Sequence, residues 1–474
     1  MRFSKYSDLR IRIRKTARPA VIVFALVLFI VLLRLPTPEG LTPEGQKALA
    51  IFSVSVLLWV THALPLMITS LMVVILFPLT GVMSARDSYA LFGNEAIFFI
   101  LGAFILASGI MRSGLSTRLA LLTLRHCGNS AGRLLLSFLG LSAFLSFWMS
   151  EHAVAAMLFP IVMEVVVALE LTPMRSRYAK ALILGMTWGC IIGGIATFLG
   201  GARAPLAVGI LKQNTGVSIG FLHWMLAALP TVVVMLAAAY FLLRTRFAPE
   251  IESIESAQTV LRRKALRMGR MTLREKGIGG LMLLTIGAWV FLGEEFGLAN
   301  IAIASVVVAF AFRLLDWKEV EEDVNWGIFL MYGGAICLGV AMESTGAAHW
   351  VAEKSLGYVV HSSGLFLMSL ALVSLFLTEA ISNTAAVALL LPLGLGLAAD
   401  FQLDPRLTTL ALTVPSGLAF QLPMGTPATA IAFSSGYIGL KDTIVGGLIL
   451  KAVALALFAF SIFYYWPYIG FSHH

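Results

Sequence analysis

The stretch LFLTEAISNTAAVALLLPLG, residues 375–394, places the polar tripeptide Ser382-Asn383-Thr384 between two apolar half-helices. A second stretch, FLSFWMSEHAVAAMLFPIV at 144–162, has the same frame but reads Ser150-Glu151-His152 at the matching place. Two broken apolar segments at corresponding positions of two halves are typical of inverted-repeat membrane proteins that bind their ligands at the breaks. The difference between the two tripeptides is therefore the main clue to what this chain binds.

The composition around these stretches is strongly apolar. Of 474 residues, 59% are hydrophobic and 12% are charged, whereas soluble globular proteins carry about 25% charged residues. The chain is therefore predicted to be a polytopic membrane protein embedded in the lipid bilayer. The net charge of +9 does not predict binding to nucleic acid, because the basic residues gather in short segments between apolar spans.

About eleven apolar segments have the length of roughly 17 to 25 residues that a helix needs to cross the hydrocarbon core. They are 19–35, 46–62, 64–84, 94–111, 178–198, 222–243, 277–294, 298–315, 325–342, 405–422 and 444–468. Two longer stretches, 134–169 and 363–399, break at the tripeptides, and each predicts a re-entrant hairpin with a polar tip at membrane depth. The expected fold is all-α, with about eleven transmembrane helices plus two hairpins.

The basic segments predict how the chain is divided and oriented. Residues 1–45 form a basic amino-terminal segment with the first span, 46–243 the first repeat, 244–276 a basic linker, and 277–474 the second repeat. Because basic loops stay in the cytoplasm, we expect the amino terminus and the linker there and the carboxyl terminus outside. No convincing cleavage site follows the first span, so we expect that span to be retained.

The two halves can be aligned over their cores with an offset of about 231 residues. The matched pairs are 94–116 with 325–347, 144–160 with 376–392, and 193–209 with 422–436. An odd number of predicted spans separates the halves, which gives them opposite orientations. Glycine, proline and threonine within the third pair predict unwound helices, whose free carbonyls and half-helix ends can bind ions.

On these motifs the chain resembles the divalent anion/sodium symporters, which carry succinate, citrate, sulfate and related anions. The resemblance covers most of the chain after residue 45. It implies a homodimer that moves a small anionic substrate by an elevator motion. It also implies sodium as the coupling ion, no other cofactor or metal, and a location in a bacterial inner (plasma) membrane.

In that family each tip and its unwound helix form a sodium site, and the tip side chains bind the substrate. Carried over, the second sodium site consists of Thr378, Ser382, Asn383, Gly425 and Pro427. The implied substrate-binding residues are Ser150, Glu151, His152, Arg203, Ser382, Asn383, Thr384 and Thr426. Hydroxyl, amide and carbonyl oxygens suit a small hard cation. The sequence departs from the usual Gly-Thr-Pro-Pro-Asn signature at Ala428-Thr429.

The first site departs from the family more strongly, because Glu151, His152 and Arg203 place ionisable groups where the family has none. Charged residues within a membrane are costly unless they pair or serve a function. Three interpretations stay open. Glu151 and Arg203 form an ion pair that replaces a sodium ion; Glu151 or His152 carries a proton during transport; or Arg203 or His152 contacts the anionic substrate directly.

A hydrolase and a passive channel are the alternatives to a transporter. Ser150-Glu151-His152 contains the residue types of a hydrolase, but adjacent residues point in different directions and no Gly-x-Ser-x-Gly or His-Glu-x-x-His motif is present. We therefore expect a transporter and not an enzyme or a passive channel. Among transporters, sodium coupling, proton coupling through Glu151 and cation-independent anion exchange remain open. Two kinds of substrate also remain open: a dianion, and a zwitterionic or otherwise atypical molecule with only one anionic end.

Overall fold

The computed structural model describes residues 2–124, 129–251, 253–356 and 362–471. Within these ranges the regular elements are all helices, and each predicted span falls on one of them. Five helical stretches are long and apolar enough to cross a membrane: Ala85–Arg112, Glu151–Ala168, Phe221–Arg246, Trp326–Ser344 and Leu440–Tyr468. Shorter apolar helices accompany them, which is the pattern expected for a membrane protein with interrupted spans.

The helices before the linker are α1 (Arg2–Arg34), α2 (Pro43–Thr61), α3 (Leu66–Thr80), α4 (Ala85–Ala90), α5 (Glu95–Arg112), α6 (Leu115–Leu124), α7 (Ala131–Ser146), α8 (Glu151–Ala168), α9 (Arg177–Gly193), α10 (Arg203–Thr215) and α11 (Phe221–Arg246). A short 3-10 turn, Leu91–Gly93, joins α4 to α5. The linker carries α12 (Glu255–Arg267).

After the linker come α13 (Leu273–Phe291), α14 (Gly293–Phe296), α15 (Leu298–Ala311), α16 (Trp317–Asp323), α17 (Trp326–Ser344), α18 (Ala347–Leu356), α19 (Ser363–Leu377), α20 (Asn383–Asp400), α21 (Pro405–Ser416), α22 (Pro427–Ser434), α23 (Leu440–Phe460) and α24 (Trp466–Tyr468). A π-helical turn, Ser461–Tyr465, joins the last two.

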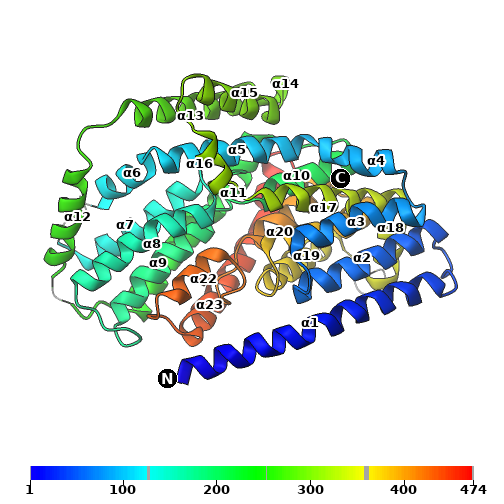
Figure 1. The fold of residues 1–474 in the computed structure, drawn as a ribbon, viewed down its shortest axis with the longest axis horizontal. Helices are drawn as coiled ribbons and strands as arrows, with labels where there is room; N and C mark the ends of the chain where they lie inside the picture. The colour runs from blue at the N-terminus through cyan, green and yellow to red at the C-terminus, as the bar shows by residue number, and fades with distance from the viewer. Residues whose placement is uncertain (1, 125–128, 252, 357–361, 472–474) are drawn as a thin grey trace.

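The two hairpins lie side by side along the long axis of the molecule. Figure 1 shows α7 and α8 beside α9 in its left half, and α19 and α20 near its middle, beside α17. In each half, the helix that follows the unwound segment packs against the hairpin of the other half. Helix α10 packs against α20, and α22 packs against α8. This exchange brings the centres of the two halves together.

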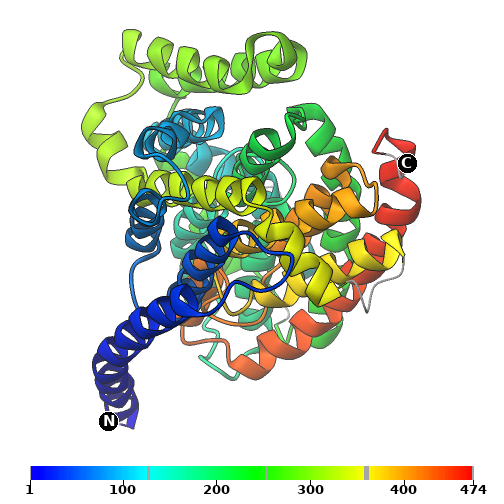
Figure 2. The same ribbon diagram turned by 90° about the vertical axis from the view of Figure 1, so that its right-hand side faces the viewer.

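Two groups of helices flank this centre. Helices α13–α15 run along one edge of the molecule and α1 along the opposite edge, which is clearest in Figure 2. Helix α15 packs against α5 of the first half. On the opposite edge α1 packs against α2, α2 packs against α3, and α3 packs against α17 of the second half, so the flanking group α1–α3 also contacts the other half.

Each hairpin breaks at its tripeptide because a serine starts a new helix there. Ser150 caps α8 by accepting a hydrogen bond from the backbone N–H of Ala153 at 3.4 Å. Ser382 caps α20 in the same way through Ala385 at 3.2 Å. Capping side chains of this type satisfy N–H groups that the helix itself leaves free. Three residues, 147–149, precede the first cap and four residues, 378–381, precede the second, and they form the rest of each tip.

The unwound segments begin earlier than the sequence indicated. The spans predicted at 178–198 and 405–422 are too long, since α9 ends at Gly193 and α21 ends at Ser416. The physical reason differs between the halves. In the first, glycines at the break let the backbone pass close to the hairpin, and a Cβ built on Gly193 would lie 2.2 Å from the carbonyl oxygen of Ala143. In the second, a buried carboxylate takes up the free backbone N–H groups, as described below.

The linker forms a helix that packs on the protein. Helix α12 contacts α6 and α8. Lys264 of α12 pairs with Glu164 of α8 at 2.6 Å, and Leu261 is fully buried. Helix α12 of the basic linker is therefore attached to the first hairpin.

Candidate functional site

The tips of the two hairpins meet at the centre of the molecule. The side-chain amide Nδ2 of Asn383 lies 3.4 Å from Oε1 of Glu151, although the two residues are 232 positions apart in the chain. Glu151 is 1% exposed and Asn383 is 7% exposed. The matching positions of the two tripeptides are therefore direct neighbours, an arrangement that the sequence comparison did not predict.

The first tip is completed by Arg203, the first residue of α10. Its Nη1 lies 3.5 Å from Oε2 of Glu151, and its side chain is 3% exposed. The expected pairing of these two residues is thus present in the structure. The backbone N–H of Glu151 also donates to the carbonyl of Gly200 at 3.0 Å, which fixes the tip to the unwound segment.

The ion pair fills the space between the two unwound segments. A Cβ built on Gly194 would lie 2.6 Å from Oε2 of Glu151, and one built on Gly417 would lie 2.5 Å from Nε of Arg203. Glycine at both positions is what allows the charged groups to lie against backbone. The remaining nitrogen of Arg203, Nη2, is buried and has no hydrogen-bond partner among the described residues. It is a free donor at the centre of the site.

His152 lies at the edge of this cluster. Its Nδ1 is 3.8 Å from Oε1 of Glu151, which is too long for a hydrogen bond, and its side chain is 44% exposed. Ser150 caps the helix as described above and is half-buried. Of the three residues of the first tip, the structure therefore places only Glu151 in the buried centre.

The second tip presents neutral oxygens. The hydroxyl Oγ1 of Thr378 lies 2.6 Å from Oδ1 of Asn383 and 2.6 Å from the carbonyl oxygen of Ser416. The structure thus brings together the expected residues Thr378 and Asn383 and adds the carbonyl of Ser416, which the sequence did not single out. A hydroxyl, an amide oxygen and a carbonyl oxygen form a donor set suited to a small hard cation such as sodium.

Behind the second tip lies a buried charged pair, Glu379 and Lys451. The carboxylate of Glu379 accepts hydrogen bonds from the backbone N–H groups of Phe420, Gln421 and Leu422 at 2.9–3.1 Å. Lys451 of α23 lies 2.9 Å from the same carboxylate and donates to the carbonyl of Leu375 at 2.7 Å. The Glu379 carboxylate therefore replaces the helical hydrogen bonds that the unwound segment lacks.

Lys451 is 1% exposed and is missing from the sequence-based set of site residues. A signal for it was available, because it is a single charge inside the apolar run GGLILKAVALAL. An intramembrane charge is a candidate for a paired or functional residue by default.

The other expected residues lie at the margin of the site. Thr426 is buried and caps α22, with its hydroxyl 3.0 Å from that of Thr429. Gly425 is buried beside Glu379, Pro427 is exposed at the first turn of α22, and Thr384 is half-buried in the first turn of α20. Side-chain hydrogen bonds join Thr378, Asn383, Glu151 and Arg203 in one network. Those of Thr426 among the described residues stay within its own turn.

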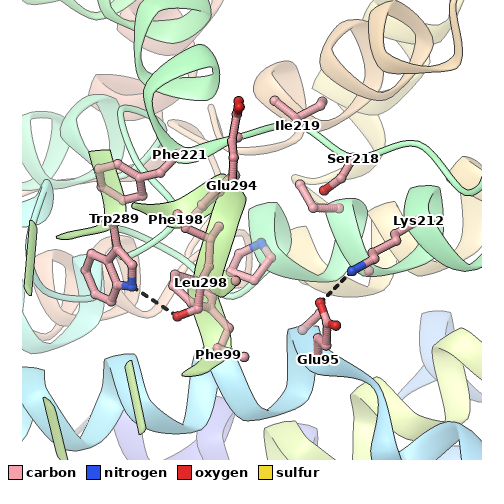
Figure 3. Close-up of a pocket in the computed structure, with 18 of the residues that line it drawn as sticks. Glu95, Phe99, Phe198, Lys212, Ser218, Ile219, Phe221, Trp289, Glu294 and Leu298 are labelled. Carbon is pink, nitrogen blue, oxygen red and sulfur yellow. Dashed lines mark hydrogen bonds and ion pairs between the residues drawn. The ribbon is translucent and has the colours of Figure 1, made fainter. Parts of the chain in front are cut away.

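A separate cavity of about 650 Å³ opens between α5, α10, the start of α11 and α13–α15. Figure 3 shows that Lys212 and Glu95 face each other at its side, where they form an ion pair at 2.6 Å. Its aromatic lining consists of Phe99, Phe198, Phe221 and Trp289. None of the tip side chains lines this cavity, and the buried polar cluster at the tips is the candidate site.

Comparison with known proteins finds a family match over most of the chain. The family described as the sodium:sulfate symporter transmembrane region matches residues 16–472. A sodium-dependent dicarboxylate transporter of Staphylococcus saprophyticus is 29% identical over 471 residues, covering 93% of this chain and 90% of that protein. A sodium-dependent dicarboxylate transporter of Staphylococcus aureus is also 29% identical, covering 94% of this chain and 90% of that protein.

A similar fold occurs among solved structures. The crystal structure of the Alcanivorax borkumensis YdaH transporter, described as having an unusual topology, superimposes with a TM-score of 0.54 at 16% sequence identity. The superposition covers 81% of this chain and 90% of the other. At this identity the similarity concerns the fold alone.

Proposed function

The chain belongs to the sodium:sulfate symporter family, whose members are membrane transporters of anions and not enzymes, and from this premise we propose its mechanism. A small carboxylate or related oxyanion binds where the two hairpin tips meet, and one sodium ion binds at the second tip. The observation that carries the proposal is the convergence of Asn383, Glu151 and Arg203, three buried polar side chains from both halves of the chain.

The sodium ion is assigned to the second tip because of its donor set. Thr378, Asn383 and the Ser416 carbonyl offer neutral oxygens that converge within hydrogen-bond distance. Ser382 lies in the same tip and contributes the cap that holds Asn383 at the start of α20. The relatives named sodium-dependent transporters support sodium as the coupling ion. Gly425 and Pro427 belong to this site only through the backbone of the unwound segment.

At the first tip we assign the place of a second sodium ion to the guanidinium of Arg203. It lies beside the Glu151 carboxylate and against the unwound segments of both halves. A tethered cation needs no ion from solution, so one sodium ion fewer is required in each cycle. Proton coupling through Glu151 is the competing mechanism, and it requires that an inward proton gradient drive accumulation when sodium is absent. Cation-independent exchange requires neither gradient.

The movement we propose is an elevator motion of an inverted repeat. Three features support it: the exchanged packing of α10 on α20 and α22 on α8, the flanking groups that contact α5 and α17, and the cavity between α10 and α13–α15. The hairpins with α10 and α22 form the moving unit, and the flanking helices form the fixed scaffold. We further propose a homodimer in a bacterial inner membrane, with the amino terminus in the cytoplasm and the carboxyl terminus outside.

The test removes the Asn383 amide, which belongs to the proposed sodium site and contacts Glu151 of the first tip. In proteoliposomes with an inward sodium gradient, Asn383→Ala is expected to reduce uptake of succinate, sulfate or another small anion to background. Asn300→Ala is the matched control, because Asn300 is exposed and its amide bonds only to the carbonyl of Phe296 at 2.9 Å. The control is expected to keep full uptake. Near-normal uptake by correctly folded Asn383→Ala protein would refute the assignment of the site.

A further inference from the structure

We propose that the Glu151 carboxylate occupies the place of one substrate carboxylate, so that the transported substrate carries a single negative charge. This inference rests on the proposed function, since it concerns the charge of the substrate bound at the same tips. It sets this chain apart from relatives that are named dicarboxylate transporters.

The first observation is that the amide of Asn383 is already in use. Its Oδ1 accepts from Thr378 at 2.6 Å, and its Nδ2 lies 3.4 Å from the carboxylate of Glu151. A carboxylate belonging to the protein thus contacts the amide expected to bind a substrate carboxylate. The same carboxylate reaches Arg203 on its other oxygen, at 3.5 Å. Glu151 therefore bridges the two halves of the site as a bound anion would.

The second observation is the balance of buried charge. Around the tips, Glu151 is offset by Arg203 and Glu379 is offset by Lys451. The other buried carboxylates of the described residues, Glu275 and Asp404, pair with Arg118 and Arg406 elsewhere in the fold. The site is therefore neutral before ligands bind. One sodium ion adds a single positive charge, which a monoanion cancels and a dianion exceeds, and an uncompensated charge in a buried site is strongly unfavourable.

The third observation is the free donor on Arg203. Nη2 is buried without a partner among the described residues, while Nη1 is engaged with Glu151. A buried N–H group without an acceptor is costly, and a charged donor binds an oxyanion more strongly than a neutral one does. Because it is charged, buried and without an acceptor among the described residues, this nitrogen is the donor to which we assign the one anionic group of the substrate. The uncharged end is then left for half-exposed polar groups such as His152 and Thr384.

The experiment compares succinate with succinamate, its half-amide, which has nearly the same shape and one negative charge fewer. Uptake of each is measured into proteoliposomes under a sodium gradient, at a pH where succinate is fully ionised. The wild-type protein is expected to prefer succinamate by about tenfold or more, since a site of fixed charge and hydrogen bonding discriminates strongly between such analogues. Glu151→Asn, which restores the amide present at the second tip, is expected to shift the preference toward succinate.

The control is Glu164→Gln, which removes a carboxylate from the same helix at a position that is 44% exposed and paired with Lys264. It is expected to keep the wild-type preference. A wild-type preference for succinate or sulfate over succinamate would overturn the inference, even if Glu151→Asn does not fold. An unchanged ratio in folded Glu151→Asn would also overturn it. Sodium-independent uptake of every anion would instead refute the proposed function.

Discussion

The two hairpin tips have the same frame but manage charge in opposite ways. In the first tip, the charged groups of Glu151 and Arg203 occupy the centre and contact each other across the site. In the second tip, neutral oxygens occupy the centre, and the charged pair of Glu379 and Lys451 lies behind it against the unwound backbone. The comparison shows that two sites with the same frame can place their buried charges differently, between the tips in one half and behind the tip in the other.

The largest effect is expected from removing the charge of Arg203, which tests whether the first tip depends on its ion pair. Arg203→Ala leaves the Glu151 carboxylate buried, with a single amide donor at 3.4 Å. Removing one partner of a buried ion pair costs about 3–5 kcal/mol. We expect the free energy of unfolding to fall by that amount and transport to stop. Thermal unfolding of the purified protein in detergent, together with uptake assays, measures both effects.

The double variant Glu151→Gln/Arg203→Gln separates charge from shape at the same tip. It removes both charges and keeps polar side chains of similar length. If the pair stabilises the tip mainly by compensating its own charges, the double variant should recover about half or more of the stability lost in Arg203→Ala. A double variant that is less stable than Arg203→Ala would contradict this account of the first tip.

The sequence predicted the frame of the site better than its contacts. The spans and both breaks follow from apolar length and from polar tripeptides, because these are local features of the chain. The contact between Asn383 and Glu151 joins residues far apart in sequence, and no local pattern encodes it. The end of α9 was misplaced because glycines there pack against the distant first hairpin. The end of α21 was misplaced because the hydrogen bonds that replace the helix come from the distant Glu379 carboxylate.

The second-largest effect is expected behind the second tip. Lys451→Met removes the ammonium group, but Glu379 keeps its three backbone N–H donors. We expect a loss of about 1–3 kcal/mol, the cost of leaving a buried group partly unsatisfied. This loss is smaller than that of Arg203→Ala because Glu151 has no comparable set of backbone donors. Unfolding measured for both variants under the same conditions tests the ranking, and an equal or larger loss for Lys451→Met would reverse it.

The number of sodium ions bound in each transport cycle tests whether the first tip, unlike the second, binds no sodium. If Arg203 stands in for an ion, wild-type uptake should depend on sodium with a Hill coefficient of about 1, since the coefficient cannot exceed the number of sites. Glu151→Asn/Arg203→Ala makes the first tip resemble the second, and its Hill coefficient should rise toward about 2. A wild-type coefficient clearly above 1 would show that the first tip still binds sodium.

The smallest effect is expected at the other end of α10, where Lys212 pairs with Glu95 at 2.6 Å. Lys212 and Arg203 lie on the same helix and both pair with a glutamate, but the Lys212 side chain is 49% exposed and that of Arg203 is 3% exposed. Exposed ion pairs contribute about 0.2–1 kcal/mol because water and salt screen them. Lys212→Ala should therefore change the free energy of unfolding by less than about 1 kcal/mol. Added salt should reduce this difference further, whereas it should leave the effect of Arg203→Ala nearly unchanged. A large, salt-independent loss for Lys212→Ala would mean that removing any cation from α10 destabilises the protein, and the contrast between the tips could then no longer be attributed to burial.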